Sequence, residues 1–348
     1  MVIHSRKEQR YQCKRCRRTF AETAGTAPSR LRTARDEVVT VVTLLAYGCP
    51  VQAIVAAYGL DERTVARWQT RAGAQCRRVH EHLVQAGRVD LGQVQADELR
   101  VRAVGGILWL ASAIALPSHL WLGGAVSPSR DARLIRTVLE RIWACGTKQA
   151  LLLCTDGLLS YPKQALRVFR VPERTGQPGH PRMLLPTGML IAQMVKRYAQ
   201  RRMVEVERRV VQGTEAAVTA TLCRTQSSAT AVINTAYIER LNATFRARLA
   251  SLTRRTRTSV HQQDTLEAGM WLIGTLYNFA RSHRSLRHPL QAETAPPRRW
   301  IGRTPAQVAG LTDHPWSVYE VLAFPVPGVG IKKRGQLPKW LREATQVA

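Results

Sequence analysis

A change of hydrophobic period between residues 90 and 157 constrains the fold more than any other feature of the sequence. Three apolar segments follow one another there, GQVQADELRV, GILWLASAIAL and HLWLGGAV, and the turns between them contain Gly-Gly and Pro-Ser, which is typical of a meander of strands. SRDARLIRTVLERIWACG then has the period of an amphipathic helix, with Ser129 as its expected cap, and ALLLCTDG is a buried type of strand that ends on Asp156. Three strands, a helix and a further strand predict an α/β domain with a mixed sheet.

Residues 36–85 have a helical pattern instead. DEVVTVVTLLAYG begins on acids and ends at Gly48, PVQAIVAAYGL has Pro50 at its start, and DERTVARWQTRAG follows a turn at Gly59 with Asp61 as its N-cap. Two short helices joined by a Gly-containing turn are typical of a helix-turn-helix, although an ordinary αα-hairpin has the same pattern. The residues expected to contact DNA are Arg63, Thr64, Arg67, Gln69 and Arg71.

The charge balance indicates a polyanionic partner. The chain has 52 Lys and Arg against 24 Asp and Glu, a formal net charge of +28. Nucleic acid is the partner that this charge favours, because each cation placed on a phosphate releases condensed counterions. A generally basic proteome is the alternative. The sequence contains no GxxxxGK[ST], HExxH or GxGxxG motif, so no small-molecule substrate is expected, and HEH at 80–82 is interpreted as surface.

Cysteine usage and apolar content indicate a compartment. The seven cysteines are odd in number and scattered, which does not form a disulfide framework and favours a reducing cytoplasm. The N-terminal residues contain no apolar signal-peptide core, and the apolar stretch around 105–126 is interrupted by Gly, Pro, Ser and His, so no membrane span is expected. We therefore expect a cytoplasmic, nucleoid-associated protein.

Three acids stand out by position in a chain that has few of them. Asp97 lies in the first strand of the meander, Asp156 at the end of the buried strand, and Glu239 at the start of the helical segment YIERLNATFRARL. Carboxylates in these places can converge at one edge of a mixed sheet, where their mutual repulsion favours bound cations. Two Mg²⁺ ions about 4 Å apart would activate the attacking oxygen and stabilise the leaving oxygen of a phosphoryl transfer.

Each acid also has an ordinary interpretation. Asp97 is interpretable as an edge-strand acid, and its neighbour Glu98 competes for the same role. Asp156 precedes a glycine and fits a turn, and Glu239 fits a helix-start acid that favours the helix dipole. The three acids in this order are the stronger interpretation.

One face of the last of these helices carries further polar groups. Glu239, Asn242 and Arg246 follow one another at i, i+3 and i+7 and therefore share a helical face. An amide and a guanidinium would then lie beside a metal-ligating carboxylate, where they suit DNA phosphates or bases. Amphipathic surface patterning is the alternative.

Five segments together resemble bacterial insertion-sequence transposases of the DDE type, whose catalytic domain has a ribonuclease-H-like fold. The resemblance is greatest to zinc-ribbon-bearing members grouped with the insertion-sequence-one family. YIERLNATFR is the most specific part of the match. The segments are QADELRV, LLLCTDGLLSY, VINTAYIERLNATFRARL, YNFARSHRSL and RTPAQVAGLTDHPWSV.

The resemblance implies a function and a site. Asp97, Asp156 and Glu239 would bind two Mg²⁺ or Mn²⁺ ions, and His283 would be an auxiliary active-site residue. The enzyme would bind terminal inverted repeats, cleave at the ends of the element and transfer the 3′-OH into target DNA, as a homo-oligomer on paired ends. A non-catalytic helix-turn-helix regulator and a ribonuclease-H-like nuclease without strand transfer are the alternatives.

The resemblance also implies the domain organisation. The expected parts are a basic remnant of a zinc ribbon (1–35), a helix-turn-helix domain (36–85), a catalytic domain (90–287, with an insertion or loop at about 171–189) and a basic Pro-rich linker and tail (288–348). Relatives carry a four-cysteine ribbon, of which Cys13 and Cys16 would be the second pair. The first pair is absent from this chain and a structural zinc site needs four ligands, so stable Zn²⁺ is not expected. Lys14 and Arg15 remain candidates for DNA contact.

Overall fold

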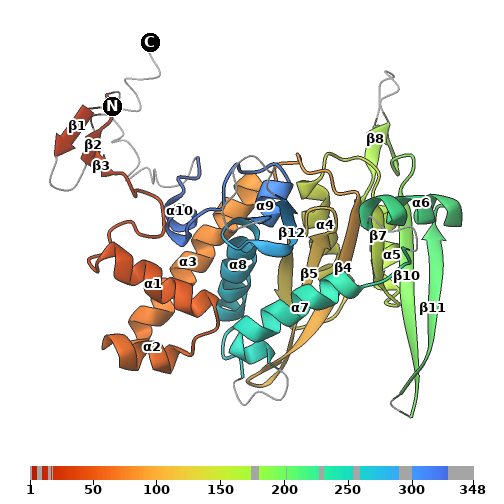
Figure 1. Ribbon diagram of the computed structural model, residues 1–348, viewed down its shortest axis with the longest axis horizontal. Coiled ribbons are helices and arrows are strands. Elements are labelled where there is room, and N and C mark those ends of the chain that lie inside the picture. The colour runs from red at the N-terminus through yellow and green to blue at the C-terminus, as the bar shows by residue number, and fades with distance from the viewer. Residues whose placement is uncertain are drawn as a thin grey trace.

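A six-stranded mixed sheet forms the centre of the computed structural model (Figure 1). Its strands lie in the order β11-β10-β7-β4-β5-β6. β4, β5 and β6 are an antiparallel meander, β7 is parallel to β4 and β10, and β11 is antiparallel to β10. The strands are β4 (Gln93–Ala103), β5 (Gly106–Ala115), β6 (Leu120–Ser127), β7 (Leu152–Asp156), β10 (Leu190–Ala199) and β11 (Arg202–Gln212). The predicted mixed α/β sheet is confirmed.

The structure describes most of the chain. The described residues are 2–5, 10–14, 17, 19–173, 180–200, 202–226, 231–253, 259–289 and 300–327. Several sequence-based expectations fall outside them: the roles of Arg15 and Cys16, part of the 171–189 insertion, part of the 288–306 linker, and the tail beyond 327. No helix in the described part of the chain has the length and apolar character needed to cross a membrane.

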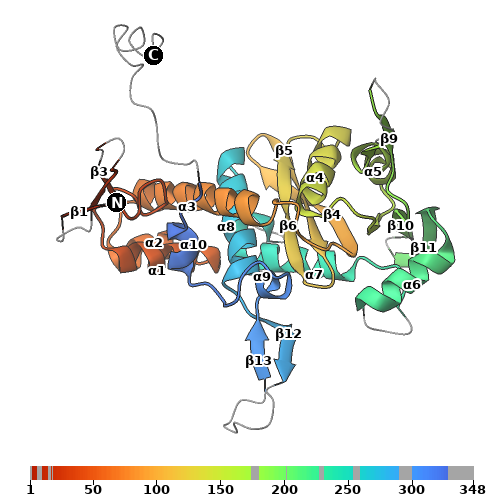
Figure 2. The same cartoon turned by 90° about the horizontal axis from the view of Figure 1, so that it is seen from above.

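Helices cover both faces of the sheet (Figures 1 and 2). α4 (Ala132–Cys145) and α5 (Ser160–Val168) lie on one face, and α6 (Glu215–Gln226), α7 (Ala236–Arg248) and α8 (Gln263–Phe279) on the other. The expectation that Ser129 caps α4 is wrong. The side chain of Asp131 accepts the Leu134 backbone N–H at 2.9 Å, so the helix begins two residues later than the pattern suggested.

Three helices precede the sheet: α1 (Arg35–Ala46), α2 (Val51–Tyr58) and α3 (Glu62–Leu83). Asp61 caps α3 as predicted, by accepting the Thr64 backbone N–H at 3.2 Å, and Gly59 takes the left-handed conformation in the turn. α3 continues for ten residues beyond Gly73, the last residue of the segment DERTVARWQTRAG. Gly73 is a packing position there and not a helix terminator.

α3 crosses α8 with almost no space between the two backbones. A Cβ added to Gly73 would lie 2.4 Å from the carbonyl oxygen of Ala268. One hydrophobic core therefore continues from the N-terminal helices into the sheet, through Trp68 on α3, Met270 on α8 and Trp121 on β6. The helical part and the sheet part of the molecule share this core.

The Gly73→Ala substitution is expected to destabilise the protein by about 3 kcal/mol, because the methyl group meets backbone atoms that cannot rotate away. The gain of about 1 kcal/mol in helix propensity is too small to offset that cost. Urea denaturation measures the change. Gly106→Ala is the matched control: it has open space around its Cβ position and is expected to stay within about 0.5 kcal/mol of the wild type. Equal effects of the two substitutions would contradict the close crossing.

The expectation that the HEH segment lies on the surface is wrong for His80. Its side chain is buried, with ring centroids 4.8 Å from Trp121 and 5.3 Å from Trp271. Burial lowers the pKa of His80 to about 3, so the ring is neutral in the core. The continuation of α3 places this residue on the face that packs against α8, whereas Glu81 turns outward and pairs with Arg77 at 2.8 Å.

Smaller elements surround this body. They are β1 (Val2–Ser5), β2 (Arg10–Gln12), β3 (Thr19–Ala21), β8 (Val171–Glu173), β9 (Arg182–Leu184), a 3-10 turn (Ala250–Leu252), β12 (His283–Pro289), β13 (Trp300–Arg303), α9 (Pro305–Val308) and α10 (Val318–Ala323). β1, β2 and β3 form an N-terminal antiparallel sheet. The paired strands β8 and β9 replace part of the loop that was expected at 171–189, and β12 with β13 replaces part of the expected linker.

Candidate metal centre

A cleft of about 340 Å³ lies between the ends of the central strands and the first turn of α7. All three acids predicted from the sequence, Asp97, Asp156 and Glu239, line it. They reach it from β4, from the end of β7 and from α7, three parts of the chain that are far apart in sequence. Two basic side chains, Arg130 and Lys196, line the same cleft.

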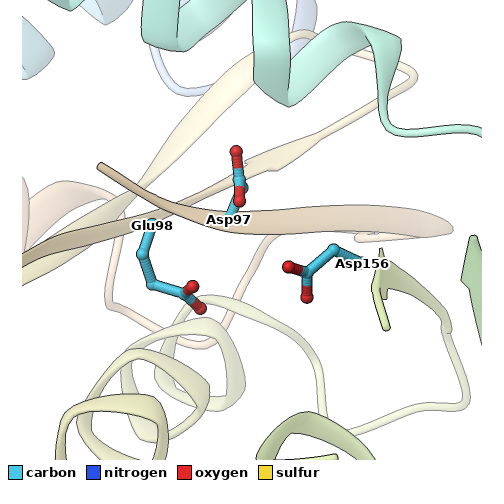
Figure 3. Close-up of side chains that lie close together, drawn as sticks. All are labelled: Asp97, Glu98 and Asp156. Atoms are coloured by element: carbon cyan, nitrogen blue, oxygen red, sulfur yellow. The ribbon is translucent and has the colours of Figure 1, made fainter. Parts of the chain in front are cut away.

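The pairing of β4 with β7 brings two of the acids together. The strands are parallel, with Ala96 opposite Thr155, so the next residue of each strand is an aspartate at the same edge. One carboxylate oxygen from each of Asp97, Asp156 and Glu98 lies within 4.8 Å of the others. Figure 3 shows Asp97 and Glu98 leaving β4 in opposite directions, with Asp156 beside them. This group of acids could hold a metal ion.

Glu239 lies on the wall of the cleft but outside this group of three. Its carboxylate accepts hydrogen bonds from the Lys196 ammonium at 2.7 Å and from the Thr235 hydroxyl at 2.9 Å. Burial opposes ionisation of Glu239, but these two donors outweigh it and lower its pKa. Lys196 therefore neutralises the charge of Glu239.

Asp97 lies in an environment that disfavours its charge. Burial, and then the neighbouring charge of Glu98, raise its pKa to about 7, with smaller contributions from Asp156 and Glu239. The amide of Asn242 donates a hydrogen bond to the Asp97 carboxylate at 2.9 Å. The carbonyl oxygen of that amide is buried and has no hydrogen-bond partner among the described residues. Asn242 thus contacts the site, as its spacing from Glu239 predicted.

A buried ion pair forms the floor of the site. The Glu98 side chain is fully buried and accepts two hydrogen bonds from Arg130, at 2.6 and 2.9 Å. Burial still raises the pKa of Glu98 above its ordinary value. Arg130 also reaches Asp156 at 3.3 Å, and its guanidinium lies over the ring of Trp109, 5.1 Å from the ring centroid. Glu98 thereby holds a guanidinium at the edge of the acidic cleft.

Two buried glutamines that the sequence analysis did not single out position the acids. Gln95 lies two residues before Asp97 on the same face of β4, and its carbonyl accepts the backbone N–H groups of Tyr237 and Ile238, each at 3.0 Å. It thereby fixes the first turn of α7 against the sheet. Gln193 on β10 donates to the backbone carbonyl of Asp156 at 2.7 Å. The alternation of side chains along β4 is the one sequence signal that pointed to Gln95.

Two other predicted residues lie away from the cleft. Arg246 is half-buried on a later turn of α7, and His283 begins β12 with its ring 4.3 Å from that of Tyr277. Burial lowers the pKa of His283 to about 4, so it is neutral near pH 7. Among the described residues, neither Arg246 nor His283 is part of the cleft lining.

The predicted DNA-contacting residues of α3 divide into two groups. Arg63 and Arg67 are exposed one turn apart, whereas Thr64 and Gln69 are half-buried. Arg71 is also half-buried and donates to a backbone carbonyl of the loop that precedes α1. Burial, and then the charge of Arg67, lower the pKa of Arg71. Of the five residues predicted to contact DNA, the two that are exposed, Arg63 and Arg67, lie in the first two turns of α3.

The N-terminal cysteine pair is only partly described. Cys13 is half-buried and Lys14 is exposed in the turn that follows β2, whereas Arg15 and Cys16 lie outside the described residues. The expectation that this pair holds no stable zinc stays a prediction.

The function of the acidic cleft is inferred from its geometry and charge. A comparison with protein-family models found no match, and no curated protein matches the chain. The features that bear on function are therefore the convergence of carboxylates at one sheet edge, the basic side chains of Arg130 and Lys196 among them, and the strongly basic charge of the chain as a whole.

Proposed function

We propose that the chain is a DDE-type DNA transposase, which cleaves the ends of an insertion sequence and transfers the 3′-OH into target DNA. The observation that carries this proposal is the convergence of Asp97, Asp156 and Glu239 on one cleft. A pocket lined by acids in a chain of net charge +28 suits a reaction on a nucleic-acid backbone. The basic surface holds the polyanion, and the acidic pocket acts on one of its phosphates.

The donor chemistry of the cleft fits a hard divalent cation. Asp97, Asp156 and Glu98 offer carboxylate oxygens close together, and the carbonyl oxygen of Asn242 lies unpartnered beside them. Mg²⁺ and Mn²⁺ favour such ligands, and two bound ions would polarise the scissile phosphate and lower the pKa of the attacking hydroxyl. Asp97, Asp156 and Glu239 are the residues that we assign to these ions.

The basic residues of the cleft have a role of their own in this proposal. Lys196 and Arg130 neutralise Glu239 and Asp156 in the structure described here. Arg130 keeps its two hydrogen bonds to Glu98 when Asp156 turns to another partner, so its guanidinium remains at the cleft and can bind a phosphate oxygen. The Lys196 ammonium can also bind a phosphate oxygen once Glu239 no longer accepts its hydrogen bond.

The surrounding fold supports the same proposal. A meander of three strands followed by a helix and parallel strands is in keeping with a ribonuclease-H-like domain. α2, the turn at Gly59 and the exposed residues Arg63 and Arg67 suit a helix-turn-helix that reads terminal inverted repeats. We further propose that the protein acts on paired ends as a homo-oligomer and associates with the nucleoid.

The test uses the purified full chain and labelled duplexes from the two DNA segments that flank its coding sequence. We expect strand cleavage that requires Mg²⁺ or Mn²⁺ and is lost with EDTA, followed by joining of the labelled 3′ end to a target plasmid. Cleavage without joining would indicate a nuclease without strand transfer. Binding with no cleavage in either metal would indicate a non-catalytic regulator and would contradict the proposal.

A further inference from the structure

The ribbon formed by β12 and β13 projects from the body of the molecule beside α9 (Figure 2). Its two strands, HRSLRHP and WIGR, contain three arginines and two histidines and no acidic residue. Most of its side chains are exposed, including Arg284, Arg287 and His288. None of the described residues of this basic ribbon lines the acidic cleft.

The base of the ribbon is held firmly. Leu286 is buried, and its backbone carbonyl accepts a hydrogen bond from the Arg303 guanidinium at 3.0 Å, which ties the two strands together. The ring of His283 packs edge-on against Tyr277 of α8. The ribbon therefore extends from a fixed base, so its exposed arginines have a defined position relative to the sheet.

That base lies beside the helix that carries Glu239. The Ser285 hydroxyl is 3.3 Å from the imidazole of His119, whose ring lies 5.2 Å from that of Tyr237 on the first turn of α7. Glu239 follows Tyr237 by two residues. The base of the ribbon is therefore linked through His119 to the first turn of α7.

One surface of the ribbon combines charge with an aromatic ring. The Arg287 guanidinium lies 4.4 Å from the centroid of Trp300, which is 45% exposed, and Ile301 beside it is 43% exposed. Large apolar side chains at the surface next to arginines suit a partner that offers both phosphates and apolar sugar or base edges. Duplex DNA has both, and its major groove, about 12 Å wide, admits a two-stranded ribbon.

We propose that the β12–β13 ribbon is a second DNA-binding element, which holds duplex DNA next to the cleft. Arg284 and Arg287 contact phosphates, and Trp300 packs against the groove edge. The inference rests on the proposed function for the identity of its partner, but it does not require that the chain cleave DNA.

The test measures binding of a fluorescein-labelled 30-base-pair duplex of random sequence by anisotropy, in EDTA and over a series of KCl concentrations. The logarithm of the binding constant falls with the logarithm of the salt concentration by about 0.9 for each phosphate contact. The double variant Arg284→Gln/Arg287→Gln is expected to reduce this slope by about 1.8. The matched control is Arg133→Gln/Arg136→Gln, on two exposed arginines of α4 on the opposite side of the sheet, and it is expected to leave the slope unchanged.

Two further variants separate charge from structure. Arg284→Lys/Arg287→Lys keeps the charge and is expected to retain the wild-type slope, whereas Trp300→Ala is expected to weaken binding about tenfold with the slope unchanged. A slope loss in the lysine variant equal to that in the glutamine variant, or equal losses in the ribbon and α4 variants, would overturn the proposal. Because EDTA prevents metal-dependent cleavage, the outcome is independent of whether the chain is a transposase.

Discussion

Asp156→Asn is expected to reduce metal-dependent DNA cleavage by about a thousandfold or more while leaving the fold intact. Asn keeps the side-chain oxygen that accepts the Leu158 backbone N–H at 3.0 Å, so the turn after β7 is preserved. The substitution removes the negative charge that a divalent cation needs. Arg130 loses one partner but keeps both hydrogen bonds to Glu98. Single-turnover cleavage of labelled duplex in Mg²⁺ measures the effect.

Asp264→Asn is the matched control for this prediction. Asp264 is an exposed aspartate in the first turn of α8, and its replacement is expected to leave the cleavage rate within about twofold of the wild type. Both variants should bind duplex DNA as tightly as the wild type in EDTA. Cleavage by the Asp156→Asn variant at the wild-type rate would show that Asp156 is not catalytic. This conclusion would hold whether or not the protein also joins the cleaved end to target DNA.

The central part of the site could be predicted from the sequence because strand geometry is regular. A run of apolar residues that ends on Asp156 predicts an acid at the end of a buried strand, and the meander predicts that Asp97 lies in a neighbouring strand. These two inferences are local, and parallel pairing of β4 with β7 then brings the carboxylates together. Glu239 then lies beside the same edge if α7 packs on the face of the sheet to which Asp97 points.

The partners of the acids could not be predicted in the same way, because they come from distant segments. Lys196, on β10, pairs with Glu239, and no local pattern around either residue indicates the other. Arg130 lies in the loop before α4, where the sequence suggested only a helix cap. The burial of Glu98 depends on which face of β4 the helices α4 and α5 cover, which is a tertiary property.

The structural role of Gly73 in the helical region could not be predicted from the sequence. Gly73 is the last residue of the segment DERTVARWQTRAG, and glycine is common after the last turn of a helix. The structure uses the absent side chain for the contact with Ala268, and the helix continues through His80. Local patterns do not distinguish a glycine that ends a helix from one that allows two helices to cross closely.

Asp97→Asn is expected to stabilise the metal-free protein at pH 8, by about 4 kcal/mol at most. The pKa of Asp97 in the folded protein is about 7, whereas its ordinary value is 3.8. Between these two pH values the folded protein binds a proton that the unfolded chain has lost, so the stability of the wild type falls as pH rises from about 4 to 7. Asn carries no charge at any pH and removes this penalty, and the Asn242 amide can still donate to its side-chain oxygen.

Thermal unfolding in EDTA at pH 4.5 and pH 8 measures the change. The variant is expected to unfold about 5 °C above the wild type at pH 8 and close to it at pH 4.5, where Asp97 is protonated. Asp264→Asn, at an exposed side chain outside the cleft, is the matched control and is expected to unfold close to the wild type. Added Mg²⁺ should raise the unfolding temperature of the wild type more than that of the Asp97 variant. The buried charge of Asp97 that destabilises the metal-free cleft favours binding of a cation, so a variant with neither effect would show that Asp97 does not contribute to a metal site.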